Sequence, residues 1–226
     1  MRRIPEKSQP TVANKLATDL SERIIDGRYP PGTSLREVPL AEEFGVSRSS
    51  VREALRILER DGVVKIEPHR GASVTRLTTD ELIEIYQVRR VLLGLAMAMA
   101  HEHCTEADLA WLDARCADME VAGRQDNARA GSMHAQISAD MALRALRLAG
   151  NKRLEQLLTQ MSAQIARYTR LGLSAPQRRT QSLQTWRALV RALGRHDSAE
   201  AEQLGRRLVS DTLRFALDRI AGLGPG

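Results

Sequence analysis

The sequence predicts a mainly α-helical protein with only a small β-hairpin. Apolar residues recur at the helical spacing of three and four positions over most of the 226 residues. Aromatic residues make up only 3% of the chain, whereas Ala, Leu and Arg are abundant, which favours helices packed through aliphatic side chains. After residue 78, no stretch has a convincing strand pattern.

We expect two structured parts behind a polar arm of residues 1–10. Residues 11–76 should hold three short helices followed by the hairpin. Residues 77–222 should form an all-helical antiparallel bundle, because short loops separate its helical segments. These segments are residues 79–102, 105–123, 127–149, 151–171, 178–195 and 197–221.

The first part begins with a helix that Thr11 caps and Gly27 ends. Ser34–Arg36 form a short strand or lead-in, and a second helix runs from Val38 to Phe44. Gly45 then supplies a tight turn into a third helix. The pattern is that of a helix-turn-helix.

The third helix starts at Ser47, a natural N-cap, and ends at Asp61-Gly62. Its buried stripe consists of Val51, Ala54, Leu55 and Leu58. Residues 63–66 and 72–75 read as two strands around a turn at residues 68–71. Three helices and a hairpin make a winged helix-turn-helix.

The opposite face of the third helix carries Arg48, Arg52 and Arg56 at every fourth position. Such a face is either a solvated surface or a surface that enters a DNA groove. The helix N-terminus favours the second reading, because hydroxyl groups and exposed N–H groups there suit a phosphate. The hydroxyls come from Ser47, Ser49 and Ser50.

The hairpin tip, His69-Arg70-Gly71, is either a wing that reaches the minor groove or an ordinary polar turn. Because it follows the helix-turn-helix directly, we favour the wing.

Bulk charge identifies no partner. The net charge is +6, and residues 1–76 contribute +3 of it, from 14 Lys and Arg against 11 Asp and Glu. No apolar run is long enough to span a membrane, and no signal peptide is evident. Two cysteines are too few for a disulfide framework, so we expect a cytoplasmic protein. We find no motif of catalysis or phosphate binding by a glycine loop, which argues against an enzyme.

Residues 30–74 resemble the winged-helix domain of GntR-family transcription regulators. The resemblance rests on Pro30-Pro31-Gly32, Leu40-Ala41-Glu42, Gly45-Val46-Ser47-Arg48, Val51-Arg52-Glu53-Ala54-Leu55 and Gly71. It implies DNA contacts by Ser47, Arg48, Ser50 and Arg52, and by His69 and Gly71 in the wing. An arginine that the family often has at the start of the second helix is Val38 here, and Arg36 lies close enough to replace it.

The helical part resembles the FCD-type effector domain of the FadR-like subfamily, on Ile85–Arg90 and Ala149-Gly150-Asn151. Many members bind a divalent metal through an Asp-x-x-x-His pair and two later histidines. Asp140 matches the Asp of that pair, but Arg144 stands at its histidine, and Trp186 and Leu208 align with the later histidines. These side chains are not metal ligands, so we predict that the metal site is lost and that no cofactor is bound.

We assign Arg89, Asp140, Arg144 and Trp186 to the effector region. Without a metal, a small organic acid could bind directly to Arg144, with Arg89 assisting and Trp186 forming an apolar wall. The alternative is that Arg144 pairs internally with Asp140. We interpret His101-Glu102-His103-Cys104 as incidental, because alternate helical positions do not share a face.

The resemblance implies a homodimeric transcription regulator, most often a repressor, that releases double-stranded operator DNA when a small carboxylate effector binds. The alternative is a constitutive or architectural DNA-binding dimer without an effector.

Overall fold

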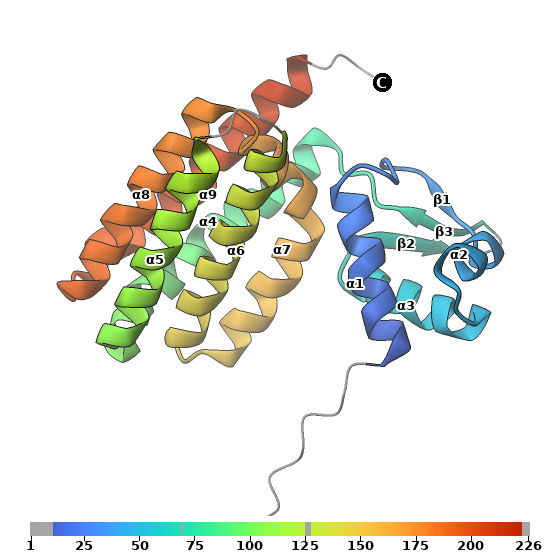
Figure 1. The fold of residues 1–226 in the computed structure, drawn as a ribbon, viewed down its shortest axis with the longest axis horizontal. Coiled ribbons are helices and arrows are strands. Elements are labelled where there is room, and N and C mark those ends of the chain that lie inside the picture. The colour runs from blue at the N-terminus through green and yellow to red at the C-terminus, as the bar shows by residue number, and fades with distance from the viewer. Residues whose placement is uncertain (1–10, 69, 125–127, 223–226) are drawn as a thin grey trace, which may run out of the picture. The chain divides into compact units, whose positions relative to one another are not determined.

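The computed structural model describes residues 11–68, 70–124 and 128–222. The chain divides into two compact units, Met1–Arg76 and Leu77–Gly226. Both follow the architecture that the sequence predicts, three helices with a small sheet and then a bundle of helices (Figure 1).

The described residues of the N-terminal unit form three helices and a three-stranded antiparallel sheet. The helices are α1 (Val12–Ile25), α2 (Glu37–Phe44) and α3 (Arg48–Arg60). The strands are β1 (Ser34–Leu35), β2 (Val64–Glu67) and β3 (Gly71–Val74), in the order β1-β3-β2. In the register, Leu35 pairs with Ala72, and Ala72 also pairs with Ile66. The short segment before α2 is therefore a strand of the sheet, not only a lead-in.

The core of this unit is aliphatic. Leu16 and Leu20 of α1 are buried against α3, which contributes the predicted stripe of Val51, Ala54, Leu55 and Leu58. α2 begins at Glu37, one residue before the predicted start. It ends at Gly45, whose φ of +64° permits the left-handed turn into α3. The opposite face of α3 is thus left in solvent.

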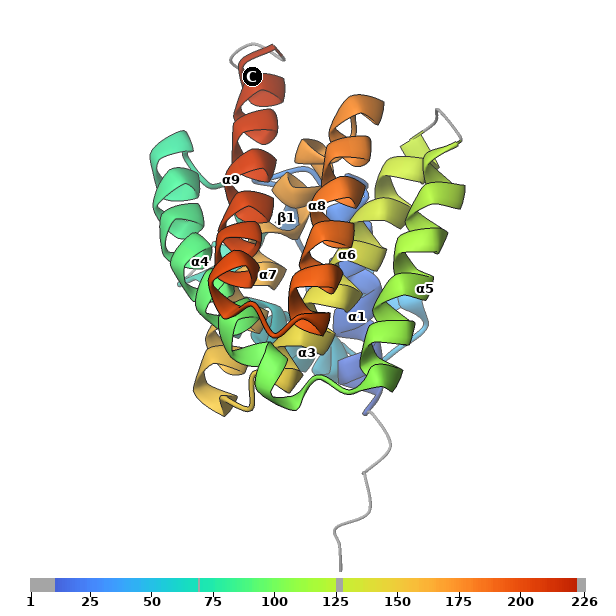
Figure 2. The same ribbon diagram turned by 90° about the vertical axis from the view of Figure 1, so that its left-hand side faces the viewer.

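The C-terminal unit is a bundle of long helices with short connections (Figure 2). Its elements are α4 (Thr79–Ala100), η1 (His101–His103), α5 (Glu106–Gly123), α6 (Ala128–Leu148), α7 (Lys152–Gly172), α8 (Pro176–Gly194) and α9 (Ser198–Gly222). Thr78 and Thr105 form capping boxes at the starts of α4 and α5. None of the described residues after Arg76 lies in a strand.

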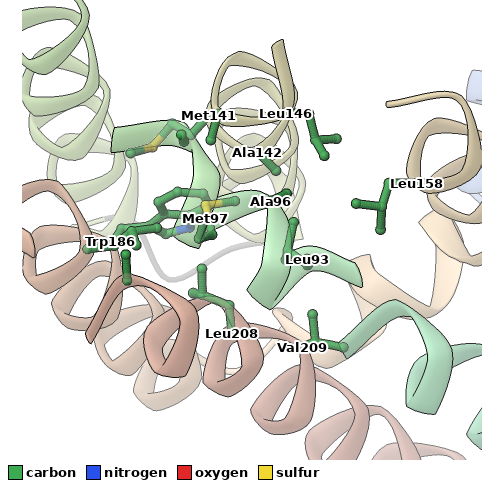
Figure 3. Packing of buried hydrophobic residues seen from close by; sticks show 14 of the residues in the cluster. Leu93, Ala96, Met97, Met141, Ala142, Leu146, Leu158, Trp186, Leu208 and Val209 are labelled. Carbon is green, nitrogen blue, oxygen red and sulfur yellow. The ribbon is translucent and has the colours of Figure 1, made fainter. Parts of the chain in front are cut away.

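α4 packs most extensively against α9. The two backbones approach closely at Gly205, where a Cβ atom would lie 2.7 Å from Cγ of Met97. Trp186, Met97, Met141 and Leu208 form part of one continuous hydrophobic core that joins these helices to α6 and α8 (Figure 3). The middle of the bundle is therefore filled with apolar side chains.

Candidate nucleic-acid interface and effector region

The start of α3 presents three serine hydroxyls. The Ser47 Oγ accepts a hydrogen bond from the backbone N–H of Ser50 at 3.1 Å, so Ser47 is the N-cap that the sequence predicts. Its Oγ also lies 2.8 Å from Oγ of Ser49 and 2.9 Å from Oγ of Ser50. A hydroxyl cluster at a helix N-terminus offers the donors that a phosphate oxygen needs.

Arg48 and Arg52 lie on the exposed face of α3 and share one acidic neighbour, Glu37 at the start of α2. Nε and Nη2 of Arg52 donate to the two carboxylate oxygens of Glu37 at 2.8 and 2.7 Å. Nη2 of Arg48 lies 3.7 Å from the same carboxylate. The hydrogen bond from Arg52 and the two positive charges lower the pKa of Glu37.

Glu37 is a residue that the sequence analysis missed. The carboxylate lies 15 residues before Arg52, and no local spacing links the two positions. It holds the Arg52 guanidinium in one orientation, while the arginine side chains remain 65% and 55% exposed at positions 48 and 52. The arginines are therefore ordered and still accessible to a partner.

The other predicted contacts lie nearby in the same unit. Arg36 precedes α2 and is exposed, and its side chain makes no capping hydrogen bond. Arg70 sits in the hairpin turn with an 83% exposed side chain, and Gly71 opens β3 with a φ of +78°. His69 lies outside the described residues. The hairpin has the form of a wing, and its insertion into a groove stays a prediction.

Arg144 pairs with Asp108 in the structure, not with Asp140, the alternative partner that the sequence offered. Nε of Arg144 donates to Asp108 at 2.8 Å, and Nη2 of Arg144 contacts the same oxygen. Asp108 is buried and also accepts hydrogen bonds from Thr105, and these bonds together with Arg144 lower its pKa. Asp140 is exposed and accepts from Gln136 at 3.0 Å. Arg144 therefore locks α6 to the cap of α5.

Trp186 is a core residue. It is 1% exposed, and its Nε1 donates to Oγ of Ser138 on α6 at 3.0 Å. Leu208, Met141 and Ala142 belong to the same apolar cluster (Figure 3). α6 thus turns Ser138 toward Trp186, and the exposed Asp140 does not join it. Among the described residues, no group of three or more His, Cys, Asp or Glu could hold a metal ion. The loss of the metal site nevertheless stays a prediction.

Arg89 is half-buried and donates to Oγ of Ser162 on α7. Burial lowers its pKa. The four predicted effector residues therefore do not converge on one another. Arg89 contacts α7, Arg144 contacts α5, Trp186 lies in the core and Asp140 is in solvent.

A buried cationic cluster lies elsewhere in the bundle, and the sequence analysis did not identify it. His134 of α6 is 1% exposed, and Arg178 and Arg179 of α8 are 0% and 2% exposed. Burial and the two arginine charges lower the pKa of His134 to about 4. Adjacent arginines near the start of a helix usually face solvent, so no sequence pattern indicates that these two are buried.

The fold and the α3 surface define a class of protein. A winged helix-turn-helix that exposes arginines on its second motif helix, followed by a helical domain, is built to read DNA. Residues 12–74 match the family model described as bacterial regulatory proteins of the gntR family, and residues 84–211 match the FCD domain. The chain belongs to the GntR family, in the group that carries an FCD domain, and this family consists of transcription regulators rather than enzymes.

Several curated relatives are repressors by name. The galactonate operon transcriptional repressor of Escherichia coli is 28% identical over 89% of this chain and 95% of its own length. The gluconate operon transcriptional repressor of Bacillus licheniformis is 46% identical over 39% of this chain and 37% of its own length. The chain spans less than half the length of the first curated relatives that it matches.

The solved structure of E. coli McbR/YncC has the same fold, with a TM-score of 0.80 at 20% identity, covering 94% of this chain and all of the other. No helix in the described part of the chain is both long and apolar enough to cross a membrane.

Proposed function

We propose that this protein is a transcription repressor that binds operator DNA through α3 and the wing, and that a small organic carboxylate weakens this binding. The observation that carries the DNA part is the pairing of two exposed arginines, Arg48 and Arg52, with a serine-lined helix N-terminus. Arginine can read guanine or neutralise phosphate, and the serines suit phosphate. In a bacterial cell such DNA lies in the cytoplasm.

In the DNA-free protein, Glu37 holds the side chain of Arg52 in one orientation. Its carboxylate neutralises part of the positive surface until a phosphate or a base edge replaces it as the partner of Arg52. A carboxylate left at the interface opposes phosphate by like-charge repulsion, which lowers affinity for DNA that offers Arg52 no good partner. Glu37 thereby favours specific over non-specific sites.

A homodimer places two copies of α3 on a short palindromic operator, with half-sites about one helical turn apart. The effector must bind the two arrangements of the dimer with different affinity if it is to release DNA. The connection at Arg76–Thr79 joins the two units and is the segment through which such a change passes. The relatives named for gluconate and galactonate operons support a carboxylate as the effector class.

The central test removes the α3 arginines. Arg48→Ala/Arg52→Ala is compared with Lys15→Ala/Arg28→Ala, which removes two exposed charges of the same unit outside the α2–α3 surface. Affinity is measured by fluorescence anisotropy on DNA selected in vitro with the wild-type chain. Each lost base contact costs about 1–3 kcal/mol, so we expect a loss of at least about thirtyfold for the α3 pair and little change for the control. Equal affinity of the α3 double variant and the wild type would refute the proposal.

The filled core around Trp186 supports a second candidate, a constitutive DNA-binding dimer. A thermal-shift screen of organic acids separates the two functions. A compound that both stabilises the protein and releases DNA establishes the regulator, and silence across the screen favours the constitutive protein. Elemental analysis after purification without chelator tests the absence of a cofactor, and a stoichiometric Zn, Ni or Mn would overturn it.

A further inference from the structure

We propose that the helical unit binds a small organic carboxylate at a buried site formed by His134 of α6 and Arg178 and Arg179 of α8. The inference names the site of the effector and rests on the proposed function for its link to DNA release. Binding itself depends only on the helical unit. The site differs from the one that Arg144 and Arg89 suggested from the sequence, because those two residues already have protein partners.

Arg178 carries the proposal. Its side chain is fully buried, and its guanidinium lies over the Phe215 ring, 5.9 Å from the centroid. Among the described residues, only its Nη2 has hydrogen-bond partners, Oγ1 of Thr212 at 3.1 Å and the carbonyl oxygen of Leu208 at 3.4 Å. Nε and Nη1 are buried and have no hydrogen-bond partner in the described part of the chain. Leaving N–H groups of a guanidinium unsatisfied inside a protein costs several kcal/mol, so an acceptor is expected at this position.

No carboxylate in the described part of the chain forms an ion pair with Arg178. Asp211 is the acid whose charge acts on this arginine, but its carboxylate is paired with Arg207 at 3.5 Å and Arg214 at 3.4 Å. Burial lowers the pKa of Arg178, and the nearby Arg214 and Arg207 act in the same direction. A water molecule could accept the free N–H bonds but could not balance this charge, whereas an anion does both.

His134 provides a second, independent observation. Both of its ring nitrogens are buried without a hydrogen-bond partner among the described residues. Nη1 of Arg179 lies 3.9 Å from where a Cβ atom of Gly131 would be, one turn before His134 on α6. Arg178 is the neighbouring residue on α8. A neutral imidazole donates one hydrogen bond and accepts another. Arg179 is already fixed through Nη1 to the carbonyl oxygen of Ser174, which holds its charge at the edge of the cluster.

A buried acceptor next to Arg178 favours a ligand that carries a hydroxyl group as well as a carboxylate. Oε1 of Gln181, three residues after Arg178 on the same helix, is buried and has no partner in the described chain. A ligand that carries a carboxylate and a hydroxyl satisfies the arginine with the first group and Gln181 or His134 with the second. Inorganic phosphate shares the anionic charge, and the experiment distinguishes the two.

The site is placed to affect the rest of the unit. Arg178 bridges α8 to α9 through Thr212 and Leu208. α9 in turn packs along α4, which begins at Thr79, directly after the DNA-binding unit. A ligand that changes the hydrogen bonds of Arg178 therefore acts on the α8–α9–α4 layer.

The test is a thermal shift of the full chain in carboxylate-free buffer with gluconate, galactonate, acetate or inorganic phosphate, followed by calorimetric titration of any hit. We expect gluconate or galactonate to raise the melting temperature by about 5 °C or more at a hundredfold excess over Kd. Arg178→Met should weaken binding at least tenfold. Arg187→Met changes another arginine of α8, one that forms an ion pair with Glu120 of α5, and should leave binding unchanged.

His134→Leu is the second variant and should also weaken binding. It tests the site even if Arg178→Met does not fold. A response to phosphate alone, no response to any of the three carboxylates, or equal binding by wild type and the folded site variants would each overturn the inference. DNA affinity without ligand is measured in parallel. Intact DNA binding with no carboxylate binding contradicts this site only, whereas lost DNA recognition by the α3 arginines contradicts the proposed function.

Discussion

His134 makes the stability of the helical unit depend on pH in a predictable direction. Burial and the charges of Arg178 and Arg179 lower its pKa from 6.5 to about 4 in the folded chain. Between these two values the unfolded state carries a proton on this imidazole and the folded state does not. The unfolded state therefore binds more protons, and stability falls as the pH is lowered through this window.

The magnitude follows from the difference between the two pKa values. One pKa unit corresponds to about 1.4 kcal/mol, so His134 alone destabilises the fold by about 2 kcal/mol at pH 5 and about 3 kcal/mol near pH 4. Above about pH 7.5 the imidazole is neutral in both states and contributes nothing to the pH dependence. Replacing His134 with Leu removes the titrating group and keeps an apolar side chain in the buried position.

The assay is urea unfolding of the wild type and His134→Leu from pH 7.5 to 4.5 in buffers without carboxylate groups. Trp111 and Trp186 are the two tryptophans of the chain, and both lie in the helical unit, so their fluorescence reports that unit alone. Acidic residues titrate equally in both proteins and cancel in the difference. The wild type should lose about 2 kcal/mol more than the variant between pH 7.5 and 5. Parallel pH profiles would refute the reasoning.

Three further predictions concern the cap, the core and the DNA surface. Ser47→Ala removes the acceptor for the N–H of Ser50 and should cost the N-terminal unit about 1 kcal/mol in urea unfolding followed by circular dichroism. Trp186→Ala empties a buried position and leaves Ser138 without its indole donor, so the helical unit should lose about 3–5 kcal/mol. Glu37→Gln removes a negative charge beside the α3 arginines. Non-specific DNA binding should tighten, and its salt dependence should steepen by up to about 0.9 in the log–log slope per protomer.

Each of these has a matched control. Ser49→Ala removes a neighbouring exposed hydroxyl that caps nothing, and it should change stability by less than about 0.5 kcal/mol. Trp111→Ala removes a half-buried ring and should cost less than Trp186→Ala. Glu22→Gln removes an exposed charge on α1 and should leave the salt slope unchanged. A variant that behaves like its control contradicts the role given to that residue.

Local signals were sufficient for the N-terminal unit. Ser47, Gly45 and the stripe of Val51, Ala54, Leu55 and Leu58 each act within one turn or one helix, so residue type and spacing predicted the elements correctly. The contact between Glu37 and Arg52 was not predicted. This contact depends on how α2 crosses α3, and sequence spacing does not reveal that crossing.

In the helical unit, the sequence predicted the helices but not the contacts between them. Helices and their loops were predicted closely, because capping residues such as Thr78, Thr105 and Asn151 are local signals. The partner of Arg144 was not predicted, because Asp108 lies 36 residues away in the sequence, on another helix. Asp140, four positions before Arg144 on the same helix, was one of the two alternatives that the sequence left open, and the structure pairs Arg144 with Asp108 instead.

The sequence by itself determined that this chain is a GntR-type winged helix-turn-helix followed by an FCD helical domain, and that serines and arginines crowd the start and exposed face of α3. The helices, the hairpin and the crowded start of α3 follow from periodicity, caps and turns, which depend on interactions between residues close in the chain, whereas the two family assignments rest on the resemblance of the motifs. Only the tertiary structure decided which polar groups are buried and with whom. Arg178 and His134 look like ordinary surface residues in the sequence. The packing of α6, α8 and α9 removes both from water and, among the described residues, leaves a guanidinium without a paired carboxylate beside an imidazole that burial keeps neutral.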